Sequence, residues 1–342
     1  MNMTVTPSPA PALETRSLTR HFGRPDGLAV KLHLAKRQPI IRALDRIDLT
    51  IPTGEFVGLV GESGSGKSTL GRIAAGLLPP STGEVEVFGR SPQGDRSVHR
   101  DVQLIFQDPQ ASLNPRMRVA EAIGEAPLVH GIANRSEIDD YVCAQMHRAG
   151  LDPALRQRFP HQFSGGQRQR ISIARALALQ PQFLVCDESV ASLDVSIQAQ
   201  ILNLFMQLRR ELDLTYLFIS HDLRVVQHIA DRVVIMYLGR IVEDAPAARF
   251  FAHPNHPYTQ GLLAEIPDLK QRRRVYAPVK GEIPSPAAPP PGCHFHPRCP
   301  AAFDRCRIER PALREIVPGH RSACHLNDVA TAPARAQTGE IA

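Results

Sequence analysis

The sequence has no tryptophan, and aromatic residues make up only 5% of its 342 residues. It also lacks an RNA-binding aromatic motif and zinc-finger spacing, so the common nucleic-acid-binding modules are not indicated. No stretch approaches the run of about eighteen apolar residues that a membrane-spanning helix needs. The first residues have no basic start followed by an apolar block, so we expect a disordered tail over residues 1–12 rather than a secretory signal. These absences favour a cytoplasmic location.

Neither charge nor cysteine content defines a function. The net charge is +6, which would suit nucleic acid, an anionic membrane surface or a membrane partner equally well. Basic residues are dispersed apart from the short run at 270–274. The six cysteines do not indicate a secreted disulfide scaffold, because the chain is large and four of them lie in its last fifty residues.

The order of apolar segments predicts an α/β core. Short apolar runs alternate with helical patterns such as residues 196–212, which indicates a mostly parallel sheet covered on both faces. The expected strands are residues 56–60, 102–106, 183–186, 216–219 and 233–237. Residues 109–164 are polar and helix-leaning, and we interpret them as a helical insertion. No internal repeat is present, so we expect one nucleotide-binding unit per chain.

Residues 61–69, GESGSGKST, lie between an apolar strand and a helical pattern. They satisfy the pattern G-x-x-x-x-G-K-[ST], in which glycines let backbone N–H groups surround a polyphosphate. Lys67 is expected to reach the β- and γ-phosphates and Ser68 to ligate Mg²⁺. The stretch is therefore predicted to be a nucleotide phosphate loop.

Polar residues follow three other predicted strands. The strand FLVC is followed by Asp187 and Glu188, a pair that can divide metal binding and polarisation of the attacking water. His221 follows the strand at 216–219 and could orient that water. Gln107 follows the strand at 102–106 and could complete the metal shell. We expect these residues to meet at the phosphate loop.

Ser164-Gly-Gly-Gln167 opens a second helix and resembles a phosphate loop without a lysine. Such a second anion site makes sense if it closes on a nucleotide held by another subunit.

The ordered motifs GESGSGKST, IFQDP, FSGGQRQR, FLVCDE, SLD and ISHD resemble the ATP-binding subunits of ABC transporters. The segments SLNPR, HPNHPYTQGLL and GCHFHPRCPAAFDRC are similar to dipeptide/oligopeptide importer ATPases, in particular the second of their two ATPases. The resemblance implies a P-loop cassette with a RecA-like parallel sheet and a helical subdomain, plus a small cysteine-containing C-terminal extension. The implied domains are the cassette at 13–250, with a helical subdomain at about 109–164, an oligopeptide-transporter C-terminal domain at 251–330, and a tail at 331–342.

The resemblance also implies residue roles. Lys67, Gln107, Glu188 and His221 would serve catalysis, with Glu188 as general base and His221 as the switch histidine. Ser68, Gln107 and Asp187 would hold Mg²⁺. Residues that would contact ATP are Phe22, Gly61, Glu62, Ser63, Gly64, Ser65, Gly66, Lys67, Ser68, Thr69, Ser164, Gly165, Gly166, Gln167 and Asp194. Residues 24–40 would be an insertion after Phe22, and Ser189 stands where the family usually has proline.

The resemblance further implies partners. These are two integral membrane permease subunits, a second ATPase that is identical or homologous, and an extracytoplasmic solute-binding protein. The chain would lie at the cytoplasmic face of the inner membrane, import di- or oligopeptides or related solutes, and bind no nucleic acid. The alternative is an ABC-type ATPase that acts on nucleic acid or the ribosome. The single cassette, the absence of heptads and the HPNHPYTQ segment argue against that alternative.

Cys293, Cys299, Cys306 and Cys324 form a separate group near the end of the chain. Four thiolates match the ligand count of a [4Fe–4S] cluster, and some members of the resembling family carry one. Zinc and no metal at all stay open as alternatives, since the CxxC spacing usual for zinc is absent.

Overall fold

The computed structural model describes residues 10–23, 39–95, 97–266 and 279–328. The predicted tail at 331–342 and the basic run at 270–274 lie outside these residues, as do most of the predicted disordered start and of the insertion after Phe22. Within the described part, the strands form one eight-stranded sheet, in the order β10-β11-β9-β8-β3-β7-β6-β5, and one three-stranded sheet, in the order β2-β1-β4.

Five parallel strands form the centre of the main sheet. They are β3 (Phe56–Val60), β5 (Val102–Ile105), β6 (Phe183–Asp187), β7 (Thr215–Ser220) and β8 (Arg232–Tyr237). Almost every residue in them is buried, as expected for a parallel sheet with both faces covered. The five strands predicted from apolar runs are thereby confirmed, and each predicted end point lies within one residue of the observed one.

Antiparallel strands complete the sheet on the β8 side. β9 (Arg240–Pro246) follows β8 through a tight turn, and β11 (His320–Ser322) pairs with β9. The short β10 (Arg314–Val317) then pairs with β11. The C-terminal segment therefore extends the sheet of the nucleotide-binding core.

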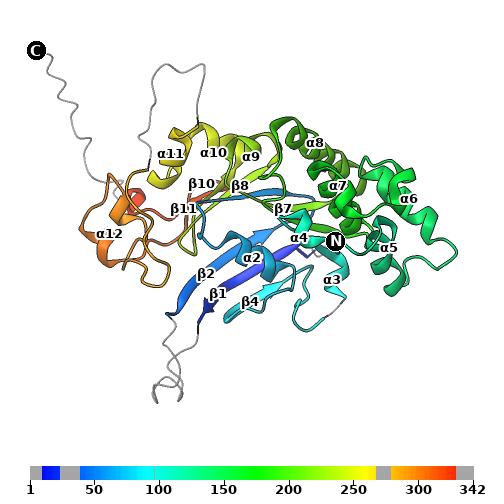
Figure 1. Ribbon diagram of the computed structural model, residues 1–342. Coiled ribbons are helices and arrows are strands. Elements are labelled where there is room, and N and C mark those ends of the chain that lie inside the picture. Colours follow the sequence, from blue (N-terminus) through cyan, green and yellow to red (C-terminus); the bar gives the residue numbers. More distant parts are fainter. Residues whose placement is uncertain (1–9, 24–38, 96, 267–278, 329–342) are drawn as a thin grey trace, which may run out of the picture.

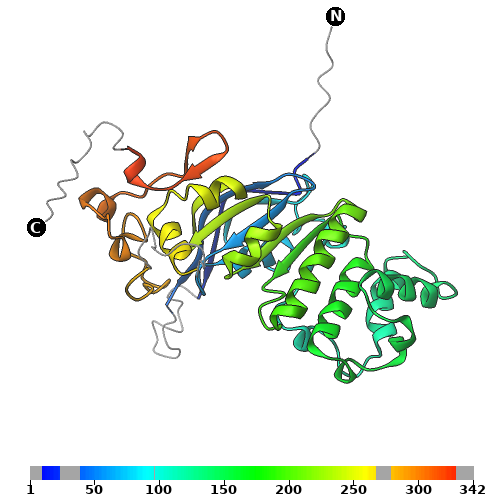
Figure 2. The ribbon, with the colours of Figure 1, turned by 90° about the horizontal axis from the view of Figure 1, so that it is seen from above.

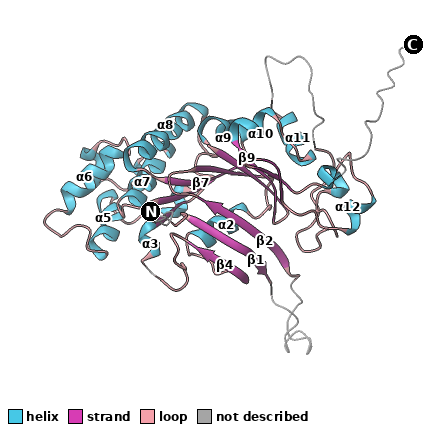
Figure 3. Ribbon diagram, turned by 180° about the vertical axis from the view of Figure 1, so that it is seen from behind, coloured by secondary structure: helices cyan, strands magenta, loops and turns pink. Residues whose placement is uncertain are grey.

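The two faces of the main sheet bury different layers (Figure 1). Along β3, Phe56 and Val60 pack into one apolar cluster, which also includes residues of α7 (Gly165–Leu177), α8 (Val195–Leu212) and α9 (Leu223–Ile229). Val57 and Leu59 point to the other cluster, with α2 (Lys67–Ala74) and the three-stranded sheet. That sheet consists of β1 (Leu13–Phe22), β2 (Ile41–Ile51) and β4 (Thr82–Glu86), and Figure 3 shows it from behind.

The predicted helical insertion is present. It contains α4 (Pro109–Ser112), α5 (Val119–Val129), α6 (Ile138–Arg148) and two short 3-10 turns, η1 (Pro153–Gln157) and η2 (Pro160–Gln162). A short helix, α3 (Val98–Asp101), precedes β5. Seen from above, α5 and α6 lie at one end of the molecule and the C-terminal region lies at the other (Figures 1 and 2).

The C-terminal region contains short elements joined by long loops. They are α10 (Ala247–Ala252), α11 (Pro257–Ala264), η3 (His296–Arg298), α12 (Asp304–Ile308) and η4 (His325–Asp328). Buried aromatic side chains, Tyr258 and Phe295 among them, join this region to the main core.

Candidate functional site

The glycine-rich segment turns from the end of β3 into the start of α2. Gly66 immediately precedes the helix and has φ = +105°, a conformation that glycine adopts without steric cost. A Cβ atom at this position would lie 2.3 Å from the carbonyl oxygen of Ala43, so a larger residue does not fit. Because α2 begins at Lys67, the unpaired N–H groups of its first turn face the loop. This arrangement is suited to binding an anion.

Lys67 is held inside the loop. Its Nζ donates hydrogen bonds to the carbonyl oxygens of Gly61, at 2.6 Å, and Glu62, at 3.0 Å. Burial lowers the pKa of Lys67, while the carboxylates of Glu188, Asp187 and Glu62 act in the opposite sense. An arriving polyphosphate would supply the anionic partner that a buried ammonium group favours.

Ser65 gives a second sign that the loop fits an anion. Its Oγ is buried and has no hydrogen-bond partner among the described residues. A buried hydroxyl without a partner is costly, and a bound phosphate oxygen would satisfy it.

Asp187 ends β6 beside the first turn of α2. Its Oδ1 accepts a hydrogen bond from Ser68 Oγ at 2.7 Å. Burial raises the pKa of Asp187, and the hydrogen bond from Ser68 opposes that shift. A hydroxyl and a carboxylate at this distance are oxygen ligands of the kind that Mg²⁺ binds together with substrate phosphates.

Glu188 stands at the centre of the remaining polar groups. Its Oε2 accepts a hydrogen bond from Gln107 Nε2 at 3.0 Å and lies 3.5 Å from Nδ1 of His221. Its backbone has φ = +47°, a left-handed conformation that a glutamate adopts at a cost. The N–H of Glu188 donates to the carbonyl oxygen of Ile219 on β7, which holds this turn in place. The structure therefore brings the six predicted polar residues together around the loop. They are Lys67, Ser68, Gln107, Asp187, Glu188 and His221.

The second glycine segment lies elsewhere. Ser164 is the N-cap of α7: its Oγ accepts from the N–H of Gln167 at 3.3 Å, and Gln167 Oε1 accepts from the N–H of Ser164 at 3.0 Å. This is a capping box, in which each side chain satisfies an otherwise free N–H group. A Cβ atom on Gly166 would lie 2.5 Å from Ile197 of α8, and Asp194 caps that helix through the N–H of Ile197. The described contacts thus join residues 164–167 to the start of α8 and not to the phosphate loop.

Two further predicted positions can be located. Phe22 is the last residue of β1 and is 36% exposed, with the guanidinium of Arg20 lying 4.8 Å from its ring centre. Ser189 follows Glu188 and is buried. The structure neither joins Phe22 to the six polar residues nor tests its proposed contact with adenine.

Two C-terminal residues contact the phosphate loop, and the sequence patterns missed both roles. Arg298 donates from its two terminal nitrogens to the two carboxylate oxygens of Glu62, at 2.7 and 2.9 Å. Tyr258 Oη accepts a hydrogen bond from the N–H of Glu62 at 3.0 Å. Both residues lie within segments that the sequence marks as unusual, HPNHPYTQ and GCHFHPRC, but nothing in the sequence indicates this contact.

The four C-terminal cysteines lie close enough to affect one another electrostatically. Burial raises the pKa of Cys293 to about 11 and that of Cys324 to about 12, and neighbouring thiols contribute to both shifts. Among the described residues, however, no group of three or more histidine, cysteine, aspartate or glutamate side chains has a geometry that could hold a metal ion. The structure therefore gives no support to the predicted iron–sulfur cluster.

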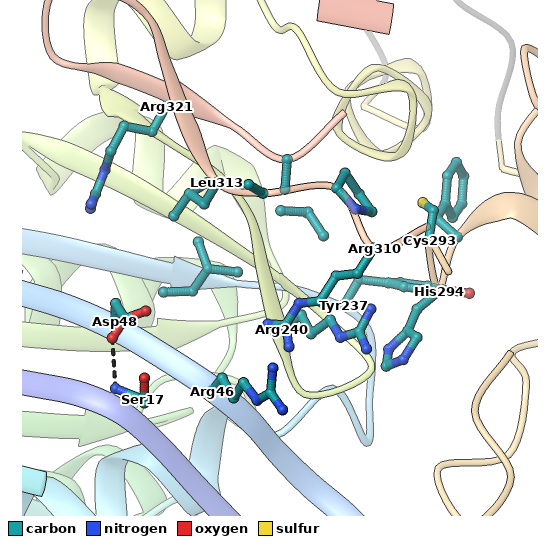
Figure 4. Close-up of a pocket in the computed structure, with 16 residues that line it drawn as sticks. Ser17, Arg46, Asp48, Tyr237, Arg240, Cys293, His294, Arg310, Leu313 and Arg321 are labelled. Carbon is teal, nitrogen blue, oxygen red and sulfur yellow. Dashed lines mark hydrogen bonds between the residues drawn. The ribbon is translucent and has the colours of Figure 1, made fainter. Parts of the chain in front are cut away.

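A cavity of about 380 Å³ lies between the C-terminal region, β1, β2 and β9 (Figure 4). Arginines contribute much of its wall, namely Arg46, Arg240, Arg310 and Arg321. Arg240 donates to Asp45 Oδ2 at 2.7 Å, and Arg310 donates to the carbonyl oxygen of Asp45 at 3.0 Å. Its described lining includes none of residues 61–69, so it is distinct from the candidate nucleotide site.

A strand–loop–helix phosphate site and paired carboxylates at the carboxyl edge of a parallel sheet define a P-loop nucleotide hydrolase. Residues 44–191 match the ABC transporter family, and residues 242–306 match the oligopeptide/dipeptide transporter C-terminal region. The chain belongs to the ABC transporter family of ATP-binding proteins. It is therefore an ATPase with the cassette fold that the motifs predicted.

Curated relatives match over most of the chain. A peptide import ATP-binding protein of Brucella abortus is 51% identical over 296 residues, which cover 84% of this chain and 87% of the relative. A peptide ABC transporter ATP-binding protein of Sinorhizobium fredii is 44% identical over 327 residues, covering 94% of this chain and 91% of the relative.

Solved structures agree on the fold. The cbiO1 subunit from Clostridium perfringens, part of an ABC transporter complex, is 27% identical, with a TM-score of 0.60 over 71% of this chain and 92% of that one. The ATP-binding cassette MJ0796, solved as a dimer with ADP and Pi, is 27% identical, with a TM-score of 0.59 over 69% and 98%. No helix in the described part of this chain is long and apolar enough to cross a membrane.

Proposed function

We propose that this chain is the ATP-hydrolysing subunit of an importer for di- and oligopeptides or related small solutes. The observation that carries the proposal is the meeting of Lys67, Ser68, Asp187, Glu188, Gln107 and His221 at one edge of the sheet. The peptide-import names of the curated relatives and the match of residues 242–306 support the substrate class.

The proposed assembly follows from that role. The chain lies at the cytoplasmic face of the membrane, bound to two integral permease subunits that receive peptide from an extracytoplasmic binding protein. A second ATPase, identical or homologous, faces this one. The cassette occupies residues 13–250 and the C-terminal domain residues 251–330.

In the proposed nucleotide site, residues 61–69 hold the phosphates of ATP and Phe22 stacks on the adenine. Lys67 places its positive charge on the β- and γ-phosphates. Ser68, Asp187 and Gln107 would hold Mg²⁺, which neutralises phosphate charge when bound.

Glu188 acts as the general base in this proposal. Its carboxylate accepts the proton of a water that attacks the γ-phosphorus in line with the departing ADP oxygen. Gln107 donates a hydrogen bond to Oε2 of Glu188, and His221 lies near the same oxygen. The two side chains therefore orient the carboxylate group. Preorganised polar groups of this kind stabilise charge in the transition state at little cost in reorganisation.

Residues 164–167 complete the site of the opposing subunit. In this chain they sit with Asp194 at the starts of α7 and α8, away from their own phosphate loop. The first turn of α7 would provide N–H donors for a γ-phosphate presented from the partner. Two ATP molecules would then close the pair, and hydrolysis would reopen it.

The substitution Glu188→Gln tests the base. We expect it to retain ATP binding and to lose about 10²–10⁴-fold in turnover, because the amide cannot accept the proton. Phosphate release and binding of labelled ATP are measured in the assembled complex, with Glu211→Gln on the exposed face of α8 as the matched control. Near-normal phosphate release by Glu188→Gln would remove Glu188 from this role.

Peptide uptake tests the substrate class. A deletion strain that carries the wild-type gene should accumulate labelled short peptides, and one that carries Glu188→Gln should not. Normal uptake in the deletion strain itself would contradict the proposal.

We also retain a [4Fe–4S] cluster on Cys293, Cys299, Cys306 and Cys324 as a proposal, which rests only on the match between four thiols and the ligand count of such a cluster. Anaerobic purification with a visible spectrum and iron and sulfide assays tests it. A colourless, iron-free and fully active protein would remove the cluster.

A further inference from the structure

Glu62, the second residue of the phosphate loop, is engaged through all of its polar groups. Its carboxylate accepts both hydrogen bonds from Arg298, and its N–H donates to Tyr258 Oη. Its carbonyl oxygen accepts from Lys67 Nζ. The backbone position of Glu62, together with that of Gly61, therefore determines where the Lys67 ammonium group is held.

The ion pair between Glu62 and Arg298 is expected to be strong because it is bidentate and largely buried. The Arg298 side chain is only 6% exposed and that of Glu62 22%. Two parallel N–H···O bonds from one guanidinium fix direction as well as distance. Because both groups are largely buried, removal of either partner leaves the other charge without compensation, which is far more costly than at the surface.

Arg298 is itself held from two sides, by β8 and by the C-terminal region. It donates to Tyr237 Oη at 3.3 Å and to the carbonyl oxygen of Lys280 at 3.3 Å. Phe295, three residues earlier, packs edge-on against Tyr237 of β8, with ring centres 5.3 Å apart, and contacts Tyr258 at the same distance. These rings anchor the segment that carries Arg298.

The cavity in Figure 4 borders this anchor, because Tyr237 and Phe295 are among the residues that line it. It occupies the space between β1, β2 and the segment that contains Cys293 and His294, so packing there is incomplete. The same segment also contacts the core through His294 Nδ1, which lies 3.0 Å from the carbonyl oxygen of Leu238, and through the carbonyl oxygen of Gly292, which accepts from Arg240 at 2.8 Å. Among these contacts, the Arg298–Glu62 pair is the one that reaches the phosphate loop.

We propose that the C-terminal region holds the phosphate loop of the same chain in the conformation that receives ATP, with Arg298 and Tyr258 as positioning residues that act through Glu62. Tyr258 and Arg298 lie within residues 242–306, the part that matches the C-terminal region and not the cassette. The C-terminal region thus raises the affinity for ATP by holding Glu62 of the phosphate loop in place. This inference rests on the proposed function only in requiring that residues 61–69 bind ATP.

A double-mutant cycle on the full-length protein tests the proposal. Affinity for a fluorescent ATP analogue and steady-state ATPase activity are measured for wild type, Arg298→Gln, Glu62→Gln and the double variant. We expect each single change to weaken binding about tenfold, which equals ~1.4 kcal/mol, and the double variant to bind no more weakly than either single one. For Arg298→Gln, KM should rise while kcat at saturating ATP stays near the wild-type value, because Arg298 acts through Glu62 and does not touch the reacting atoms.

Three further variants separate positioning from loss of structure. Tyr258→Phe keeps the ring and removes only the acceptor for the Glu62 N–H, so it should weaken ATP binding with an unchanged thermal midpoint. Arg298→Lys should restore part of the affinity that Arg298→Gln loses. Arg310→Gln is the matched control, since it removes a partly buried C-terminal arginine that pairs with Asp45 rather than with the loop.

Three outcomes would overturn the inference. The first is wild-type affinity in folded Arg298→Gln and Glu62→Gln, and the second is an equal loss in Arg310→Gln. The third is strict additivity of the two single changes, since it would mean that the two residues do not act on each other. Failure of the wild-type protein to bind the analogue would instead contradict the proposed ATP site itself.

Discussion

Gly58 shows how closely the phosphate loop depends on packing behind it. It lies in the middle of β3, the strand that leads into the loop, and faces α9. A Cβ atom at this position would lie 2.3 Å from Cγ1 of Val226 and 3.3 Å from Cβ of Ala230. Glycine is required here by the close approach of a helix and not by backbone conformation.

The substitution Gly58→Ala should therefore destabilise the protein by about 1–3 kcal/mol, the usual cost of overpacking a core. Urea unfolding followed by circular dichroism measures the change. Gly94→Ala is the control, because a Cβ atom there would meet only the carbonyl oxygen of Ser91 at 4.0 Å. Equal midpoints for the two variants would show that α9 moves away without cost.

At the residue scale, some contacts of the site could be predicted from the sequence and others could not. Asp187, Glu188 and His221 follow apolar strands, and the carboxyl ends of parallel strands meet at one edge of a sheet, so their proximity follows from pattern alone. The Arg298–Glu62 pair joins residues 236 positions apart, in a region without regular periodicity. Nothing local specifies such a contact, because it depends on how the C-terminal loops pack on the finished core.

At the scale of elements, buried Glu243 joins three of them. It lies on β9 and accepts from His320 Nε2 on β11 at 2.8 Å, and from the N–H groups of Asn255 and His256 ahead of α11 at 2.8 and 2.9 Å. His256 is the N-cap of α11, since its Nδ1 accepts from the N–H of Tyr258 at 3.1 Å. The position of Tyr258 thus depends on a histidine cap.

This cap should make stability pH-dependent. Burial lowers the pKa of His256 to about 4 from its ordinary value of 6.5, although Glu243 opposes the shift. The folded state requires the neutral ring, whereas the unfolded chain takes up a proton near pH 6.5. The stabilisation is therefore complete above pH 6.5 and is lost as the pH falls from 6.5 to 4.

In His256→Asn, an acceptor for the cap remains but does not titrate. Between pH 7 and pH 5 the wild type should lose on the order of 2 kcal/mol more unfolding free energy than this variant. Urea titrations at the two pH values measure the difference, with exposed His253→Asn as control. Parallel losses in wild type and His256→Asn would assign the pH dependence to other groups.

The strands that the sequence pattern did not predict were missed for a common physical reason. β1, β2 and β4 carry exposed polar residues on one face and contain register shifts, so their alternation is interrupted. β10 and β11 span only four and three residues. Such strands exist because neighbouring strands and the core beneath them provide partners, a condition that a local window of sequence does not contain.

At the scale of the whole molecule, the proposed function gives one chain one half of each of two ATP sites. The polar residues around Lys67 lie at the phosphate loop, and residues 164–167 lie at a separate helix end. A solved cassette with the same fold was determined as a dimer with ADP and Pi. We therefore expect ATP to link two cassettes.

Slowing hydrolysis should make this association visible. Glu188→Gln with MgATP, alone or with the second ATPase of the same transporter, should elute in gel filtration at the mass of a pair and return to single chains when ATP is removed. Adding Lys67→Ala to the same variant should abolish the shift, because the phosphate charge is then unmatched. A single-chain mass under all these conditions would contradict the shared-site arrangement.

The attachment of Glu62 to Arg298 also limits how such proteins can diversify. If Arg298 positions the loop as proposed, a cassette and a C-terminal region taken from different relatives would form a chimera with full ATP affinity only if the acidic residue in one half met a guanidinium group in the other. We therefore expect recombination between the two gene segments to lower ATP affinity wherever it separates the two members of this charge pair.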